Sequence, residues 1–137
     1  MENVRRKTLM GGEMTTRTIR VLIVDDQLRA RDSMKALLST CARVGEVREA
    51  CNGREAIELV GKFRPDVVLI DIRMPEIDGL KATLLIKALW PQVKIIALSL
   101  YADHRAEALD AGADAFVPKV EAWERLLGTL EGLFQET

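Results

Sequence analysis

Residues 21–26 read Val-Leu-Ile-Val-Asp-Asp, four apolar residues followed at once by two carboxylates. The surrounding run Ile19–Val24 is short and rich in β-branched residues, which is typical of a strand that is covered on both faces. A second such run, Val-Val-Leu-Ile-Asp, occupies residues 67–71. A buried strand that ends in a carboxylate is therefore predicted twice, and the rest of the chain can be interpreted from these two strands.

Predicted strands and helices alternate from Ile19 onward. Strands are expected at Ile19–Val24, Val44–Cys51, Asp66–Ile70, Val93–Leu98 and Ala115–Val117. Apolar residues at helical spacing predict helices at Leu28–Leu38, Gly53–Phe63, Leu80–Leu89, Asp103–Ala111 and Glu121–Phe134. Five strands alternating with five helices predict an α/β fold with a parallel sheet, and right-handed crossovers would place helices on both of its faces.

Three details of the helices are also predicted. Gly112 is expected to close a short fourth helix as a left-handed C-cap. In the last helix, Trp123 and the leucines that follow it are assigned to the core. The inner face of the third helix is predicted to consist of Leu84, Leu85, Ala88 and Leu89.

The length and composition are those of one globular domain. The chain has 137 residues, of which 48% are hydrophobic and 30% charged. Residues 1–18 show no periodicity and are predicted to form a flexible N-terminal tail. The domain itself is expected at residues 19–134, with 135–137 as its C-terminal end. Met14 is an alternative start residue to Met1, because the patterned chain begins just after it.

Several classes of function are disfavoured by the composition. The net charge of -1, from 20 basic and 21 acidic side chains, gives no reason to expect direct nucleic-acid binding. Cys41 and Cys51 do not have zinc-site spacing, and the single histidine, His104, gives them no partner, so both are interpreted as reduced, partly buried thiols. No apolar run is long enough to span a membrane and no secretory signal is found, so a cytoplasmic location is predicted.

Polar side chains follow four of the five predicted strands. Asp25 and Asp26 follow the first, Asp71 the third, Ser99 the fourth and Lys119 the fifth. Sites in open parallel sheets form beyond the carboxyl ends of the strands, so these side chains should meet at one edge. Three crowded carboxylates repel one another unless a cation intervenes, and Mg²⁺ is the cation that best suits such oxygen ligands.

The other two side chains at this edge suit phosphoryl chemistry. Lys119 is expected to pair with Asp71 at rest and with a phosphoryl oxygen later, and Ser99 can donate a hydrogen bond to another phosphoryl oxygen. No pair of nucleophile and histidine is expected, and His104 is interpreted as a solvated helix residue. Hydrolysis by a catalytic triad is therefore not predicted.

Several motifs, in this order, resemble the receiver domains of bacterial two-component response regulators. The resemblance covers residues 19–134, and the chain is most similar to receivers that often precede a helix-turn-helix domain. It implies a flavodoxin-like (βα)5 fold with strand order 2-1-3-4-5. The motifs are residues 21–26, 67–71, Met-Pro-Glu-Ile-Asp-Gly at 74–79, Ala-Gly-Ala-Asp-Ala-Phe at 111–116 and Pro118-Lys119.

The resemblance implies roles for the acidic residues. Asp71 resembles the phosphoacceptor. Asp26 and Asp71 resemble carboxylate ligands of Mg²⁺, with Asp25 close by and often acting through water. The backbone carbonyl of Arg73 resembles the third protein ligand. Asp78-Gly79 is interpreted as a turn into the third helix, with no chemical role.

The resemblance also implies a switch. Ser99 resembles the hydroxyl that turns toward the phosphoryl group, Lys119 the ammonium that binds it, and Phe116 the aromatic switch that moves inward when Ser99 moves. The residue after the switch hydroxyl is often small in these receivers, whereas here it is Leu100, and the next residue, Tyr101, is also large. Both are expected to shield the phosphoryl group and slow self-dephosphorylation.

The predicted function is that of a phosphoacceptor rather than an enzyme. A histidine kinase or histidine phosphotransfer protein would transfer a phosphoryl group to Asp71. The fourth helix, fifth strand and fifth helix would then contact a downstream protein target or form a homodimer. The chain is expected either to signal alone or to be a piece of a longer regulator. One alternative is a pseudo-receiver that binds proteins without phosphorylation. Another is a Mg²⁺-dependent phosphatase with an aspartyl nucleophile, which Arg73 disfavours because such enzymes place an acid there.

Overall fold

The computed structural model describes residues 6–7, 16–74 and 77–135. Its main sheet consists of β3 (Ile19–Val24), β4 (Val44–Ala50), β5 (Val67–Asp71), β6 (Lys94–Ser99) and β7 (Ala115–Pro118). The helices are α1 (Leu28–Leu38), α2 (Gly53–Phe63), α3 (Gly79–Leu89), α4 (Arg105–Asp110) and α5 (Ala122–Leu133). Two short 3₁₀ turns, η2 (Ala102–His104) and η3 (Lys119–Glu121), precede α4 and α5.

The sheet is parallel throughout and its strands lie in the order β4-β3-β5-β6-β7. Counted along the sheet's own five strands, this is the order 2-1-3-4-5, so the predicted fold class and topology are confirmed. The predicted element boundaries differ from the observed ones by one or two residues at most. The predicted C-cap is also confirmed, because Gly112 has φ of 111° just after the short helix α4.

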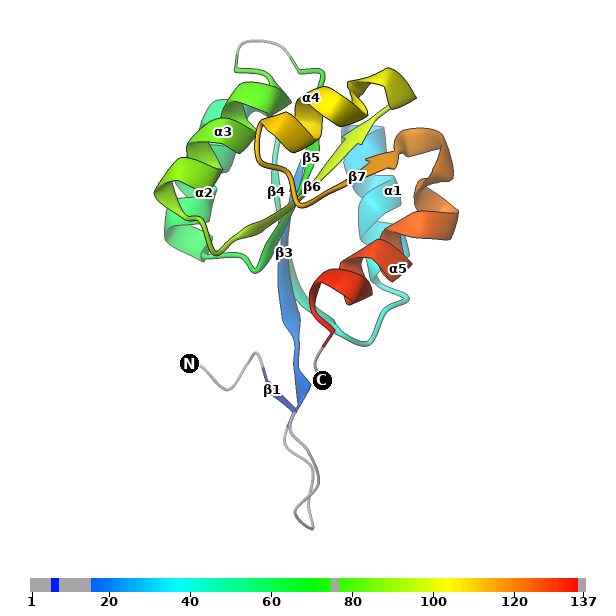
Figure 1. Cartoon of the computed structure of the whole chain (residues 1–137). Helices are drawn as coiled ribbons and strands as arrows, with labels where there is room; N and C mark the ends of the chain where they lie inside the picture. The colour runs from blue at the N-terminus through cyan, green and yellow to red at the C-terminus, as the bar shows by residue number, and fades with distance from the viewer. Residues whose placement is uncertain (1–5, 8–15, 75–76, 136–137) are drawn as a thin grey trace.

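Helices cover both faces of the sheet, as expected. Helices α2, α3 and α4 pack on one face over side chains such as Leu22, Val68 and Ile95, and α1 and α5 pack on the other over Val21 and Leu69. Figure 1 shows the two groups of helices on either side of the strands. All strand side chains of β5 are buried, which explains why this segment reads as a continuous apolar run.

The prediction for the inner face of α3 was wrong. Leu84, Leu85, Ala88 and Leu89 are all exposed, and the buried face consists of Gly79, Ala82, Thr83 and Ile86. The reason is the close approach of the start of α3 to β5. The N–H of Gly79 donates to the carbonyl of Ile72 at 2.8 Å, and a Cβ at position 79 would overlap the backbone carbonyl of Asp71. Only small side chains fit next to such a contact.

Two further core assignments need correction. Trp123 is 63% exposed, because the buried stripe of α5 runs through Ala122, Leu126 and Leu130, and the next residue along a helix points away from that stripe. The leucines after it, Leu126 and Leu130, are buried as predicted. The cysteines are not both partly buried. Cys41 is buried at the turn between α1 and β4, whereas Cys51 is exposed at the end of the outer strand β4.

The predicted N-terminal tail falls mostly outside the described residues. Within it, β1 (Arg6–Lys7) pairs antiparallel with β2 (Thr16–Arg17) in a two-residue ladder. The flexibility expected of residues 1–18 and the boundary of the domain at 19–134 stay predictions. None of the helices in the described ranges has the length and apolar character needed to cross a membrane.

Candidate functional site

Three carboxylates meet at the carboxyl edge of the sheet. Asp25 and Asp26 directly follow β3, and Asp71 is the last residue of the neighbouring strand β5. One carboxylate oxygen from each residue lies within 4.8 Å of the other two. Asp25 and Asp71 are buried, whereas Asp26 is exposed. The structure therefore brings together the acidic residues that the sequence predicted.

Each buried carboxylate is oriented by the backbone that follows it. The N–H of Gln27 donates to Oδ1 of Asp25 at 2.9 Å, and the N–H of Arg73 donates to Oδ1 of Asp71 at 3.1 Å. In both cases the donor lies two residues after the aspartate, which is the Asx-turn geometry. The two side chains are thus fixed in the same way at the ends of adjacent strands.

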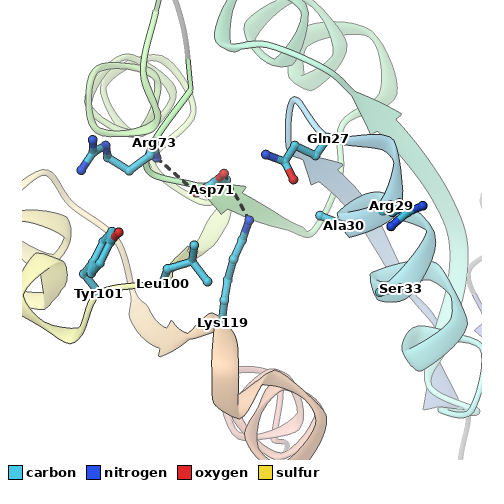
Figure 2. Close-up of a pocket in the computed structure, with 9 residues that line it drawn as sticks. All are labelled: Gln27, Arg29, Ala30, Ser33, Asp71, Arg73, Leu100, Tyr101 and Lys119. Atoms are coloured by element: carbon cyan, nitrogen blue, oxygen red, sulfur yellow. Dashed lines mark hydrogen bonds and ion pairs between the residues drawn. The ribbon is translucent and has the colours of Figure 1, made fainter.

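Lys119 bridges the two buried carboxylates. Its Nζ donates to Oδ2 of Asp25 at 2.7 Å and to Oδ2 of Asp71 at 3.2 Å. Figure 2 shows the lysine side chain rising from the end of β7 toward Asp71. The predicted pairing with Asp71 is confirmed. The shorter contact with Asp25 was not predicted, because the sequence alone does not indicate which carboxylate lies nearer to the ammonium.

The buried position shifts the pKa values of the pair. Burial raises the pKa of the Asp71 carboxyl, and the charge of Asp25 raises it further, although Lys119 and the N–H of Arg73 act in the opposite direction. Burial alone would lower the pKa of Lys119, but the hydrogen bond to Asp25 and the charges of Asp71 and Asp25 outweigh it, so the pKa is raised. The lysine therefore stays charged at neutral pH.

The acidic cluster fits Mg²⁺. All three candidate ligands offer carboxylate oxygens, and no sulfur or imidazole nitrogen belongs to the cluster in the described residues. Asp25, Asp26 and Asp71 would hold the ion. For Arg73, the structure shows the N–H bonded to Asp71 and an exposed side chain, and the predicted role of its carbonyl as a ligand stays a prediction. Pro75 and Glu76, in the motif that follows, lie outside the described residues.

Asp71 opens into a cavity of about 460 Å³. Residues of α1, the ends of β5 and β6, and the start of η3 surround it (Figure 2). Leu100 and Tyr101, which are 60% and 57% exposed, form its apolar side. The lining residues are Gln27, Arg29, Ala30, Ser33, Asp71, Arg73, Leu100, Tyr101 and Lys119. An incoming group can therefore reach the Asp71 carboxylate from solvent.

Ser99 has partners that the sequence did not indicate. Its side chain is fully buried, with 0% exposure. Its Oγ lies 2.6 Å from Nδ1 of His104 and accepts a hydrogen bond from the N–H of Tyr101 at 3.1 Å. The interpretation of His104 as a solvated residue was therefore wrong, as was the expectation that no nucleophile–histidine pair exists. The η2 turn is the reason, because it folds the half-buried imidazole back onto the end of β6.

The Ser99–His104 pair does not form a catalytic triad. A triad needs an accessible hydroxyl and a carboxylate that orients the imidazole. Ser99 is enclosed, and among the described residues no carboxylate is hydrogen-bonded to His104. The imidazole instead packs edge-on against Tyr101, with ring centroids 5.6 Å apart.

Phe116 occupies a different position from the one its predicted role requires at rest. Its ring is only 4% exposed and belongs to the core under α2, α3 and α4. It is therefore already inside while Ser99 is bonded to His104. A role as an aromatic switch that moves inward with Ser99 stays a prediction.

Arg31 is a second residue of the site that the sequence did not reveal. Its Nη1 donates to the backbone carbonyl of Asp25 at 2.9 Å, and its Nε donates to Glu49 at 2.8 Å. Lys35 also contacts Glu49, at 2.7 Å, and these contacts lower the pKa of that glutamate. Arg31 thus connects the segment that follows β3, which contains Asp25 and Asp26, to the neighbouring strand β4. Its position on a helix face carries no pattern that would distinguish it from a surface arginine.

Comparisons with known proteins agree with this geometry. Residues 21–131 match the family described as response regulator receiver domain. The chain is 35% identical over 121 residues to response regulator MprA of Mycolicibacterium vanbaalenii, and the aligned region covers 87% of this chain and 52% of that protein. It is 38% identical over 104 residues to response regulator VraR of Staphylococcus aureus, covering 74% of this chain and 50% of that protein. The chain thus spans about half the length of the curated relatives it matches.

A solved structure gives the same result. The crystal structure of response regulator TrrA from Thermotoga maritima, in complex with Mg²⁺ and BeF, superposes with a TM-score of 0.78 at 31% identity. The match covers 85% of this chain and 99% of that one. The residues matched by the family, 21–131, include Asp25, Asp71 and Lys119.

Proposed function

This chain belongs to the response regulator receiver domain family, and we propose that it accepts a phosphoryl group on Asp71 from a histidine kinase or a histidine phosphotransfer protein. The observation that carries the proposal is the position of Asp71. It is buried at a strand end, lies within reach of Asp25 and Asp26, contacts Lys119 at 3.2 Å, and still opens into a cavity. Receiver domains are not a family of turnover enzymes, and no further catalytic group is needed for this step.

The proposed transfer is a direct displacement. An oxygen of Asp71 forms a bond to phosphorus while the bond between phosphorus and the donor's imidazole nitrogen breaks, and that nitrogen keeps the electron pair. Bound Mg²⁺ would neutralise charge on the transferring group. Lys119 contributes a positive charge that is already in place, because its ammonium contacts Oδ2 of Asp71 in the unmodified protein. The protein mainly positions the groups.

The response is proposed to follow from differential binding of the new dianion. Lys119 and Ser99 would bind phosphoryl oxygens in an active conformation, which shifts a pre-existing equilibrium. The face made by α4, β7 and α5 would then bind a downstream protein target or a second copy of the chain. A cytoplasmic location follows from the proposed partnership with a kinase.

Two alternatives are weaker. A Mg²⁺-dependent phosphatase would need an acid at position 73, and Arg73 places a cation beside the cavity instead. A pseudo-receiver independent of phosphorylation would have no use for the cluster of three carboxylates with Lys119. The exposed Leu100 and Tyr101 beside the cavity are the feature that favours this second alternative, because they could serve as a binding surface.

The test is direct phosphorylation of the purified protein. We expect acetyl phosphate and Mg²⁺ to add one phosphoryl group to the wild type, measured as intact mass, and to add none to Asp71→Asn. Removal of Mg²⁺ with a chelator should abolish the gain. A wild type that binds Mg²⁺ yet gains no mass, from either acetyl phosphate or a phosphorylated histidine phosphotransfer protein, would support the pseudo-receiver.

A further inference from the structure

The hydroxyl of Ser99 is already engaged by residues other than those of the acidic cluster. Its two hydrogen-bond partners, His104 Nδ1 and the N–H of Tyr101, both belong to the segment between β6 and α4. No hydrogen bond joins Ser99 to Asp71 or Lys119 in the described part of the chain. The Ser99 side chain is fully enclosed, so water does not compete for these bonds.

The Ser99 hydroxyl can make only a few hydrogen bonds, so its present partners limit which other groups it can bind. A serine hydroxyl has one proton to donate and can accept other hydrogen bonds on its oxygen. The N–H of Tyr101 takes one acceptor position, and the 2.6 Å contact with Nδ1 of His104 uses either the hydroxyl proton or the second acceptor position, according to the tautomer of His104. In either tautomer, Oγ must leave the 2.6 Å contact with His104 before it can turn toward a phosphoryl oxygen at Asp71.

We propose that His104 is a positioning residue that holds Ser99 in the inactive conformation through the 2.6 Å hydrogen bond between Nδ1 and Oγ. This inference rests on the proposed role of Asp71 as phosphoacceptor. To bind a phosphoryl oxygen, Ser99 must give up His104, and the segment from Leu100 to His104 then loses the shorter of the two hydrogen bonds that join it to Ser99 of β6. The free energy of that bond therefore opposes phosphoryl binding, and phosphoryl binding in turn releases the start of α4.

The segment that His104 holds has few other attachments. The η2 turn and α4 together cover only Ala102–Asp110, and of these residues only Ala108 is buried. Leu100 and Tyr101, which precede it, are mostly exposed. The two hydrogen bonds to Ser99, of which the one to His104 is the shorter, can therefore decide where this segment lies, because little apolar burial would oppose its movement.

The test measures binding of beryllofluoride, a mimic of the phosphoryl group, by ¹⁹F NMR with Mg²⁺ in excess. His104→Phe keeps a ring against Tyr101 but removes the hydrogen-bonding nitrogen. We expect it to bind beryllofluoride about twofold to tenfold more tightly than the wild type, which corresponds to the loss of one opposing hydrogen bond. His104→Asn retains a hydrogen-bonding amide close to the position of Nδ1 and should stay near the wild type. Asp103→Ala, on the same exposed turn, is the matched control and should change nothing.

A second substitution separates this inference from general loosening of the turn. Ser99→Ala removes the hydroxyl that His104 binds. In a protein that already carries Ser99→Ala, adding His104→Phe should therefore not raise the affinity for beryllofluoride. An equal gain in the Ser99→Ala background would overturn the inference, as would unchanged affinity in His104→Phe. A wild type that binds no beryllofluoride would instead refute the proposed function.

Amide hydrogen exchange in metal-free protein gives an independent readout. The amides of residues 101–105 should exchange faster in His104→Phe than in the wild type or in His104→Asn, whether or not phosphoryl chemistry occurs. Equal exchange in all three proteins would show that His104 does not hold the segment.

Discussion

The side chains at the carboxyl edge of the sheet fall into two groups that are held in place in different ways. On one side, Asp25, Asp71 and Lys119 are joined by ion pairs of 2.7 and 3.2 Å and oriented by backbone N–H groups. On the other side, the segment between β6 and α4 is attached to Ser99 by hydrogen bonds to His104 and to the N–H of Tyr101. We therefore expect the firmly connected side to carry the phosphoryl chemistry and the loosely connected side to carry the conformational change.

The largest expected effect lies on the connected side. Lys119→Met removes the ammonium between Asp25 and Asp71 while keeping much of its chain length. We expect the rate of phosphorylation by acetyl phosphate to fall about a hundredfold, as for the loss of one preorganised charged donor. The rate is measured by intact mass over time. A fall of less than about threefold would show that the lysine is not part of the chemistry.

The contact between α3 and β5 should be nearly as sensitive. Gly79→Ala places a Cβ against the carbonyl of Asp71, so the helix or the strand must shift. We expect a loss of about 2 kcal/mol in the free energy of unfolding, measured with denaturant. Gly128→Ala is the matched control. A Cβ there meets no neighbour within 4 Å, and the change should be neutral or stabilise α5 by about 0.5–1 kcal/mol. Equal losses in both variants would contradict the importance of this contact.

A smaller effect is expected on the loosely connected side. Leu100 and Tyr101 form the apolar side of the cavity in front of Asp71. Replacing both with alanine should let water reach the phosphoryl group and shorten the half-life of the phosphorylated protein a few-fold. The half-life is followed by mass spectrometry after removal of the donor. An unchanged half-life would contradict the shielding role predicted for these two residues.

The smallest effect concerns pH and stability without metal. The pKa of Asp71 is raised on folding, mainly by burial, so the unfolded chain releases the proton at lower pH than the native protein. The free energy of unfolding therefore falls as the pH rises from the pKa of Asp71 in the unfolded chain to its pKa in the folded protein. Above that range the whole loss of stability is present. Asp71→Asn should therefore raise the Tm of metal-free protein slightly at neutral pH, with no gain in acid. A lower Tm at neutral pH would mean that attraction to Lys119 outweighs burial.

The two sides also differ in how far they could be predicted. The acidic residues and Lys119 follow strands with strong local patterns, and the geometry of parallel sheets brings strand ends together. The pairing of Ser99 with His104 depends instead on the η2 turn, which has no distinctive sequence pattern. Arg31 escaped prediction for a related reason, because its contacts with Glu49 and Asp25 join segments whose distance apart is set only by the finished fold.

The error in α3 teaches the same lesson within one helix. Two stripes of this helix have helical spacing, and the one with more leucines, Leu84, Leu85, Ala88 and Leu89, was assigned to the core. The close approach of Gly79 to β5 instead selects the stripe of Gly79, Ala82, Thr83 and Ile86. Hydrophobicity alone indicated the wrong stripe, because the deciding contact is between backbone atoms.

The exposed Trp123 has an optical consequence. It lies four residues beyond Lys119 at the start of α5, with its indole largely in water, whereas Trp90 packs against the core next to Gly61. A fluorescence signal from this protein therefore has two sources in contrasting surroundings. A partner that covers the start of α5 should shift the Trp123 emission to shorter wavelength and leave the Trp90 contribution in place. The chain thus carries its own probe for the surface next to Lys119, with no label required.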